Sequence, residues 1–392
     1  MSGSTAVPPP RLLSLDAYRG AVMILLACNG FGLAAFVKDS GSPSLTWLEF
    51  HTSHPQWMSQ FYLFGLSLWD MIQPAFMFIV GVAVPYSFAK RRSFGDSRSK
   101  ILKHALWRCL LLILLGVFLQ STRAEETNWI FTNVLCQIGL GYGLLIAMAG
   151  RTYRSQIIVG GVILALSWLA FALYPAAPSE EGAAEKVGQL TGFFGHWSMH
   201  GNLAADFDHW FLNLSPRSEP FTTNPGGYTT LNFIPASVTM LLGLMCGQLL
   251  RDERYAPAEK LRRLLIGGAV CLGLGVLLGG TVCPIVKRLW TPSWALFSGA
   301  YAIWLLALFY WVIDLRGWRR WAFPCVVAGM NSLALFVMGS TLRGWTVGQL
   351  HIHLPAVLFT RPRGVVVETT LAGLLFWLVC YWMYRQKIFI RL

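Results

Sequence analysis

The feature that most limits how this chain can fold is a series of ten apolar segments, each about 20 residues long. They lie at residues 20–37, 69–89, 103–120, 133–149, 156–174, 230–250, 264–282, 293–313, 321–340 and 369–385. A helix of that length crosses the hydrocarbon core of a bilayer. Only 12% of the 392 residues are charged and mean hydropathy is +0.52, whereas about a quarter of an ordinary soluble domain is charged. The sequence therefore predicts an all-α integral membrane protein, a bundle of about ten transmembrane helices.

The basic residues predict how this bundle is oriented. If the N-terminus is cytoplasmic, ten spans return the C-terminus to the cytoplasm, and the 31 Lys and Arg residues then divide into 22 inside and 9 outside. This asymmetry is the positive-inside pattern of membrane proteins. The densest inner cluster is "KRRSFGDSRSK" at 90–100. Orientation in the membrane accounts for the net charge of +13, so we expect contact with membrane lipid and none with nucleic acid.

The same topology divides the chain into three parts. Residues 1–18 form a cytoplasmic lead, residues 19–340 form the transmembrane core, and residues 341–392 contain an outer loop, the last transmembrane helix and a cytoplasmic tail. The core carries two long outer loops, at 38–68 and 175–229. Long polar loops are frequent places for binding sites. We therefore expect a site on the non-cytoplasmic side.

The histidines are distributed unevenly across this topology. Only His104 falls inside, while seven fall outside: His51, His54, His196, His200, His209, His351 and His353. Such a distribution favours acid–base chemistry or a metal at the outer face. "HWSMH" at 196–200 has the i, i+4 spacing of two imidazoles on one helix face, but no carboxylate follows at a matching spacing, so we predict no metal site. The eight cysteines are scattered without a C-x-x-C pair, which argues against a zinc site or a disulfide framework.

Several polar side chains interrupt the apolar segments. A polar group in hydrocarbon costs several kcal/mol unless it faces a cavity or a partner. Such groups therefore line an internal pocket or form hydrogen bonds between helices; they are Asn29, Asp70, Gln73, Gln137 and Asn331. Asp70 has the strongest functional case because it lies at the outer end of its span, on the same side as His54. A carboxylate there can orient an imidazole.

Three blocks of sequence carry a resemblance to a known family. They are "RLLSLDAYRG" at 11–20, "WDMIQPAFMFIVGVAVPYS" at 69–87, and the block at 289–337 that begins "LWTPSWALF". In this order they resemble the transmembrane heparan-α-glucosaminide N-acetyltransferase family and its bacterial relatives. The resemblance implies an enzyme of the bacterial inner membrane that moves an acetyl group from cytoplasmic acetyl-CoA to an amino sugar or related glycan on the non-cytoplasmic side.

The resemblance also implies which residues form the site. The family has its catalytic histidine in an H-x-x-W sequence just before a D-x-x-x-P span, and here "HPQW" supplies His54 and Trp57 while Asp70 and Pro74 supply the second motif. His54 would then be the general base, with Asp70 as its partner. The family's second polar group, an asparagine near the outer end of the first span, matches Asn29.

Acetyl transfer requires groups of this kind. Attack of an amine or hydroxyl on a thioester needs a base with a pKa near neutrality, and it needs a donor to the developing oxyanion. His54 and Asn29 can supply them. His51 is left open as an alternative base, and direct transfer is left open against an acetyl-histidine intermediate.

The chain departs from the family pattern in three places. "MSQFYLF" is inserted between Trp57 and Gly65, Ile138 replaces an arginine, and "NPGG" at 224–227 replaces D-P-E-G. The sequence therefore does not identify the acceptor.

The co-substrate is expected to meet basic residues. Acetyl-CoA is polyanionic and would approach from the cytoplasm, where Arg19, Lys90 and Arg91 can bind its phosphates. Asn331 and Trp290, in the last of the three blocks, are further predicted contacts with acetyl-CoA. Two other classes of function remain: a proton-coupled or small-solute transporter, and a non-catalytic membrane scaffold. The oligomeric state is left open, with a homodimer among the alternatives.

Overall fold

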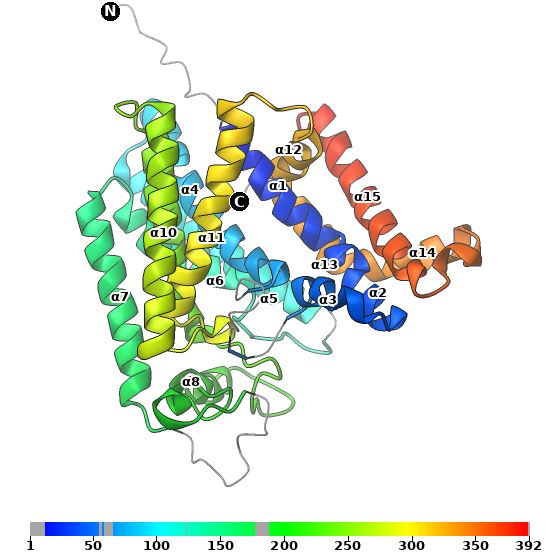
Figure 1. Ribbon diagram of the computed structural model, residues 1–392, viewed down its shortest axis with the longest axis horizontal. Helices are drawn as coiled ribbons and strands as arrows, with labels where there is room; N and C mark the ends of the chain where they lie inside the picture. The colour runs from blue at the N-terminus through cyan, green and yellow to red at the C-terminus, as the bar shows by residue number, and fades with distance from the viewer. Residues whose placement is uncertain (1–11, 55–56, 59–65, 123, 177–187, 391–392) are drawn as a thin grey trace, which may run out of the picture. The chain divides into compact units, whose positions relative to one another are not determined.

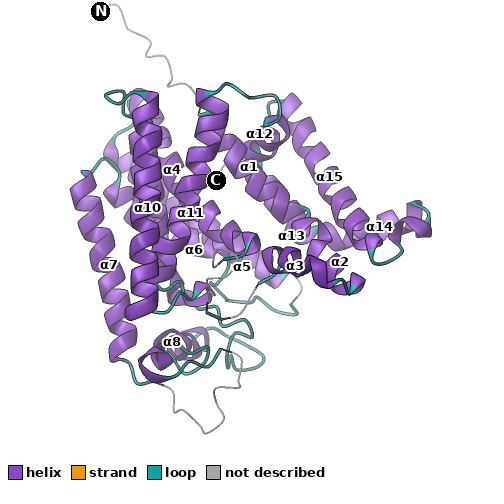
Figure 2. Ribbon diagram, viewed as in Figure 1, coloured by secondary structure: helices purple, strands orange, loops and turns teal. Residues whose placement is uncertain are grey.

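The computed structural model describes residues 12–54, 57, 58, 66–122, 124–176 and 188–390. Across this part of the chain every regular element is a helix and no strand occurs, as Figure 2 shows. The predicted all-α class is therefore confirmed. Most of the predicted N-terminal lead, most of the "MSQFYLF" insertion and residues 177–187 of the second predicted outer loop lie outside the described residues.

The chain forms two compact units, and the boundaries between them fall within two long helices, α4 (Leu68–Ser93) and α11 (Pro292–Phe309). Residues 77–307 belong to the first unit, and residues 13–76 and 308–392 belong to the second. Because these units are defined by packing, the functional division at residues 19 and 340 stays a prediction.

The first unit consists mainly of long helices, and Figure 1 shows their order along the chain. Besides parts of α4 and α11 it contains α5 (Arg98–Ser121), α6 (Val134–Met148), α7 (Tyr153–Leu173), η5 (Gly192–Trp197), α8 (Leu203–Leu212), η6 (Thr230–Asn232), α9 (Phe233–Arg251), α10 (Pro257–Thr281) and η7 (Lys287–Leu289). The helix α9 packs against α6 and α7. Its contact with α4 is so close that a Cβ added at Gly81 would lie 1.9 Å from the Met240 oxygen, and one added at Gly243 would lie 2.0 Å from the Phe78 oxygen. Small residues of this kind let membrane helices approach backbone to backbone.

The second unit contains shorter and broken helices. They are α1 (Leu13–Ala27), η1 (Asn29–Gly32), α2 (Leu33–Ser40), η2 (Pro43–Leu45), α3 (Thr46–Thr52), the start of α4, η8 (Tyr310–Leu315), α12 (Phe323–Met330), α13 (Ser332–Thr341), α14 (Arg343–His353), η9 (Ala356–Phe359) and α15 (Arg363–Arg385). The helix α1 packs along α12, where a Cβ at Gly20 would lie 1.6 Å from the Cys325 oxygen. The helix α15 packs against η1, the break after α1.

The ten predicted spans all coincide with helices, but their number is not confirmed. Within the described residues, seven helices are long and apolar enough to cross a membrane, or nine if each of two bent pairs is one span. The bent pairs are α1 with η1 and α2, which turns by 46°, and α12 with α13, which turns by 80°. The one predicted segment not counted among these nine spans is 133–149. It corresponds to α6, which is apolar but has only 15 residues.

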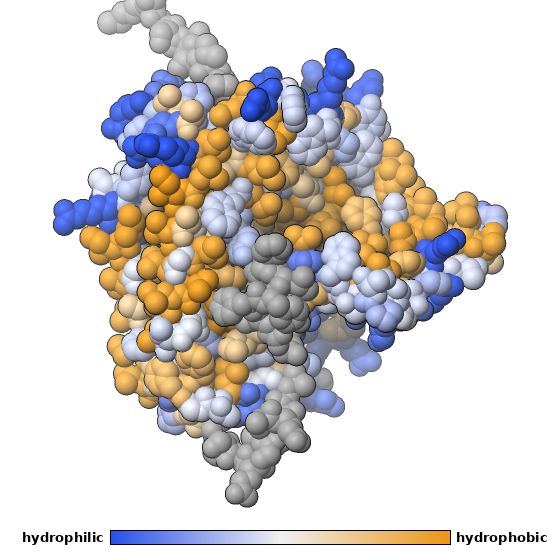
Figure 3. Space-filling model, viewed as in Figure 1, coloured by the Kyte–Doolittle hydropathy of each residue, from blue (hydrophilic) through white to orange (hydrophobic). Residues whose placement is uncertain are grey.

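The surface of the long helices indicates a multi-pass membrane protein. Only 11% of the apolar window of α7 and 22% of that of α10 is buried, and Figure 3 shows apolar side chains over the face that these two helices present. In water such a surface would be costly, whereas hydrocarbon accommodates it. The helices α4 and α9 carry basic residues in their last turns.

Candidate active site

The two residues that the sequence singled out at the outer loop lie in contact. His54 Nδ1 and Asp70 Oδ1 are 2.7 Å apart, which is a short hydrogen bond. Asp70 is in the first turn of α4, and its side chain is 11% exposed, whereas that of His54 is 41% exposed. A carboxylate bound at Nδ1 fixes the tautomer in which Nδ1 carries the proton and Nε2 is the basic nitrogen.

Ser67 joins the segment that carries His54 to the start of α4. Its buried hydroxyl donates to the Ser53 carbonyl oxygen at 2.9 Å and accepts from the Asp70 backbone N–H at 2.9 Å. The second bond is an N-cap, which satisfies one of the unpaired donors at the end of a helix. The Asp70 carboxylate is also favoured by the positive end of the helix dipole. The geometry of His54 and Asp70 therefore depends on the way in which α4 begins.

The segment that carries Asn29 approaches the same place. A Cβ added at Gly30 would lie 3.3 Å from Cζ3 of Trp69, and the Trp69 ring centre is 6.4 Å from that of His54. Asn29 itself is exposed and has a φ of 49°. The structure thus brings η1, the end of α3 and the first turn of α4 together, and it places Asn29 next to a residue that contacts this turn.

The break after α1 follows from local sequence and from a distant arginine. Residues 29–32 all have positive φ, which glycine adopts at little cost and asparagine tolerates better than most residues. The last carbonyls of α1 would otherwise lack partners. Arg343 at the start of α14 donates to the oxygens of Leu26 at 2.8 Å and Ala27 at 3.1 Å. This contact holds the end of α1 in place.

His51, the alternative base, lies in a different environment. It is in the last turn of α3, and its ring packs edge-on against Phe50 with centres 5.2 Å apart. Its Nδ1 is buried and has no hydrogen-bond partner among the described residues. Burial lowers the pKa of His51, because it disfavours the charged imidazolium. His51 therefore lacks the carboxylate that orients His54.

Comparison with known proteins agrees with the resemblance. The chain is 23% identical over 429 residues to human heparan-α-glucosaminide N-acetyltransferase and 23% identical over 430 residues to the mouse protein of the same name. Each match covers 97% of this chain and 60% of the relative. The chain is similar to the heparan-α-glucosaminide N-acetyltransferases. No protein-family model matches it, and it spans about 60% of the length of these curated relatives.

The residues predicted to contact the co-substrate fall in both units. Arg19, on α1 in the second unit, lies 3.9 Å from Asp16. Lys90 and Arg91 are in the last turn of α4 in the first unit; Lys90 lies over the Phe94 ring, and Arg91 binds Asp96 at 3.3 Å. A contact of any of the three with acetyl-CoA stays a prediction.

Asn331 is fully buried at the bend between α12 and α13. Its Nδ2 donates to the Ile388 carbonyl oxygen at 3.2 Å, and its Oδ1 accepts from the Ile390 N–H at 3.2 Å. Through these two bonds the Asn331 side chain fixes the segment that follows α15. A contact with acetyl-CoA stays a prediction for Asn331.

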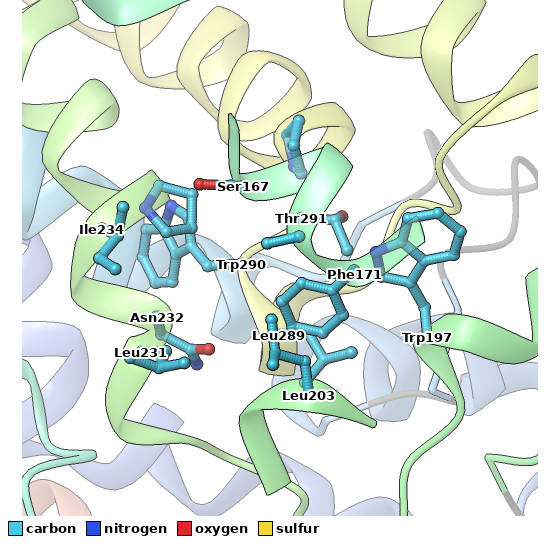
Figure 4. Close-up of a pocket in the computed structure, with 13 residues that line it drawn as sticks. Ser167, Phe171, Trp197, Leu203, Leu231, Asn232, Ile234, Leu289, Trp290 and Thr291 are labelled. Carbon is cyan, nitrogen blue, oxygen red and sulfur yellow. The ribbon is translucent and has the colours of Figure 1, made fainter. Parts of the chain in front are cut away.

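Trp290 lies in an apolar cavity of the first unit. Its indole Nε1 donates to Thr239 Oγ1 at 3.1 Å, and its backbone has a φ of 49°. Figure 4 shows Trp290 on one side of Phe171 and Trp197 on the other, in a cavity of about 60 Å³. Trp290 therefore forms part of an aromatic wall, and its contact with acetyl-CoA stays a prediction.

The histidines of "HWSMH" do not share a helix face as the spacing suggested. The helix η5 ends at Trp197, Ser198 is extended, and His196 Nδ1 is 2.7 Å from the Tyr174 carbonyl oxygen. The described part of the chain contains no group of three or more His, Cys, Asp or Glu side chains placed to hold a metal ion. The bulk of the loop instead folds back on itself around α8.

Sequence reasoning missed Ser67, although a signal was present. "SLWD" at 67–70 has the [ST]-x-x-[DE] pattern that begins a helix before an apolar run. The sequence also showed "NPGG" at 224–227 only as a departure from the family pattern, without a structural role. The Asn224 side chain there accepts from the N–H of Gly226 at 2.9 Å and of Tyr228 at 3.3 Å, so it builds the turn.

Proposed function

We propose that this protein is a transmembrane acyltransferase, which transfers the acetyl group of cytoplasmic acetyl-CoA to an amino sugar or related glycan on the non-cytoplasmic side. The observation that carries the proposal is the 2.7 Å hydrogen bond between His54 and Asp70, in a chain similar to heparan-α-glucosaminide N-acetyltransferases along 97% of its length. The distribution of the basic residues, which predicts that the loop carrying His54 is outside, supports the proposed sidedness.

His54 is the proposed general base. Its Nε2 takes a proton from the acceptor amine while the amine nitrogen bonds to the thioester carbonyl carbon. The Asp70 carboxylate stabilises the imidazolium that forms and keeps Nδ1 protonated. The carbon–sulfur bond then breaks, the electron pair leaves with sulfur, and the proton on Nε2 passes to the CoA thiolate. The products are an acetamide and CoA, and His54 is restored.

Asn29 is the proposed donor to the oxyanion. Its amide NH₂ can donate to the thioester oxygen as that oxygen gains charge, a contribution worth several kcal/mol when the donor is preorganised. The left-handed backbone of residues 29–32 supports this role, and so does the narrow space between Gly30 and Trp69, where an added Cβ would lie 3.3 Å from the Trp69 ring.

A small-solute transporter is the second candidate, and the two bent helix pairs favour it. Discontinuous helices form the substrate sites of many transporters. One experiment separates the two functions. Purified protein is given labelled acetyl-CoA and a panel of amino sugars, and we expect label to appear on one sugar together with an equal amount of CoA thiol. Solute uptake by proteoliposomes, with no transfer of label to any sugar, would favour the transporter and contradict this proposal.

A further inference from the structure

A basic pocket lies in the first unit, and of its cationic residues only Arg91 is among the predicted co-substrate contacts. It is bounded by the end of α4, the start of α5 and the end of α6, and it is a small cavity of about 20 Å³ that opens to further space at the surface. Arg91, His104 and Arg108 line it, together with Ser87 and Tyr142. No acid lines the pocket, and three residues that carry or can carry positive charge do.

Arg108 is the side chain in this pocket whose charge is least compensated. Its Nη1 donates to the Tyr142 hydroxyl at 3.2 Å, and its guanidinium carbon lies 5.0 Å from the Tyr142 ring centre. Its Nε is buried without a hydrogen-bond partner, and no carboxylate of the described residues is within salt-bridge distance of it. A buried guanidinium donor with no acceptor is costly. An anion in the pocket would remove that cost.

The other charges near the pocket leave it net positive. Arg91 shares the carboxylate of Asp96 with Lys100, at 3.3 Å and 2.6 Å respectively. The pKa of Asp96 is held below its usual range, chiefly by the hydrogen bond from Lys100 and further by Arg91, so this carboxylate is ionised. One carboxylate thus serves two cations. His104 lies four residues before Arg108 on α5, and this spacing places both on one helix face.

We propose that this pocket binds a phosphate group carried by a larger molecule. The guanidinium fork of Arg108 matches phosphate oxygens, and Arg91, His104 and the Ser87 hydroxyl can donate to the same group. The phosphate has two possible sources: the 3′-phosphate of a CoA-type acetyl donor, or the headgroup of an anionic lipid. The first rests on the proposed function and the second does not. Either source agrees with the expected position of the pocket near the cytoplasmic side.

Two experimental arms distinguish the sources, each with wild type, Arg108→Gln and Lys103→Gln. Lys103 is an exposed cation on the same helix that does not line the pocket, so its variant controls for loss of charge. In detergent, thermal stabilisation by CoA is compared with that by 3′-dephospho-CoA. In nanodiscs, the melting temperature of the protein in phosphatidylcholine alone is compared with that in phosphatidylcholine mixed with phosphatidic acid. A charge-assisted hydrogen bond to phosphate is worth roughly tenfold to hundredfold in affinity.

If the donor is the source, Arg108→Gln should weaken CoA binding roughly tenfold or more and leave the binding of 3′-dephospho-CoA unchanged. If lipid is the source, phosphatidic acid should stabilise wild type and Lys103→Gln but not Arg108→Gln. Should Arg108→Gln fail to fold, His104→Gln takes its place. This variant leaves the contact between Arg108 and Tyr142 intact, and it should show the same effect in the same arm.

Equal behaviour of the pocket variants and Lys103→Gln in both arms would overturn the phosphate pocket. Acetyl transfer is measured separately on wild type, so the two proposals fail independently. If wild type transfers acetyl groups but neither CoA binding nor lipid stabilisation depends on Arg108, only the phosphate pocket is contradicted. If wild type transfers no acetyl groups but its stabilisation by phosphatidic acid depends on Arg108, only the proposed function is contradicted.

Discussion

The hydrogen bond between His54 and Asp70 joins two residues that are sixteen positions apart, and its length is 2.7 Å. The residue that ties their segments together is Ser67, which binds the Ser53 carbonyl and caps the helix that carries Asp70. The imidazole is therefore oriented by the start of α4 rather than by the loop alone. In this respect the pair resembles other histidines whose ring is fixed by a carboxylate.

The first prediction concerns the carboxylate of this pair. Asp70→Asn keeps the size of the side chain but removes the charge that stabilises the imidazolium. We expect acetyl transfer to fall at least roughly tenfold, but by less than in His54→Ala, because the imidazole stays in place while it loses the charge that stabilises its protonated form. Glu49→Gln, on α3 five residues before His54, is the matched control and should keep its activity. A fully active Asp70→Asn protein would exclude this role for Asp70.

The second prediction uses the buried carboxyl of Asp208 in α8. Burial raises the pKa of Asp208 from 3.8 to about 6, although the Thr230 N–H bound to it acts in the opposite direction. The unfolded chain then loses this proton at lower pH than the folded protein. The contribution of Asp208 to the free energy of unfolding should therefore fall as pH rises from about 4 to about 6, by an amount on the order of 3 kcal/mol.

Asp208→Asn removes this titration and can still accept from Thr230. We expect the difference in melting temperature, Asp208→Asn minus wild type, to be larger at pH 7.5 than at pH 4.5. Melting in detergent across this range tests the prediction, with Asp206→Asn on the same helix as a control for loss of a carboxylate. A difference between Asp208→Asn and wild type that stays constant with pH would contradict it.

The positions of the helices were largely predictable, because a long apolar run in a membrane protein has few alternatives to a helix. All ten segments coincide with helices. The breaks were not predictable from hydropathy. The turn at Asn29 depends on Arg343, more than 300 residues later, and the bend at Asn331 depends on backbone groups of Ile388 and Ile390.

The candidate site shows the same division. The order of His54 and Asp70 along the chain suggested a pair, and the structure places them in hydrogen-bond contact. The basic pocket had no comparable signal. Arg108 lies inside an apolar segment, where its charge was explained by orientation in the membrane, and only the packing of three helices places it beside His104 and Arg91.

The third prediction concerns topology. On the ten-span arrangement residue 219 is outside and residue 99 is inside, and both side chains are exposed. In intact cells, Glu219→Cys should react with an impermeant thiol reagent, and Ser99→Cys should react only after permeabilisation. Background labelling should be low because six of the eight native cysteines are buried and two are half-buried. The reverse pattern would place His54 on the cytoplasmic side.

The central claim is that His54 is the base, and acetyl transfer by His54→Ala and His51→Ala tests it most directly. We expect His54→Ala to bind acetyl-CoA and elute like wild type, while its transfer rate falls by roughly 10²–10⁴-fold, the usual contribution of a positioned general base. His51→Ala should lose less than about tenfold, because no carboxylate of the described residues bonds to His51. An inactive His51→Ala with an active His54→Ala would assign the base to the other imidazole. Full activity in both variants and in the double variant would contradict histidine catalysis in this loop.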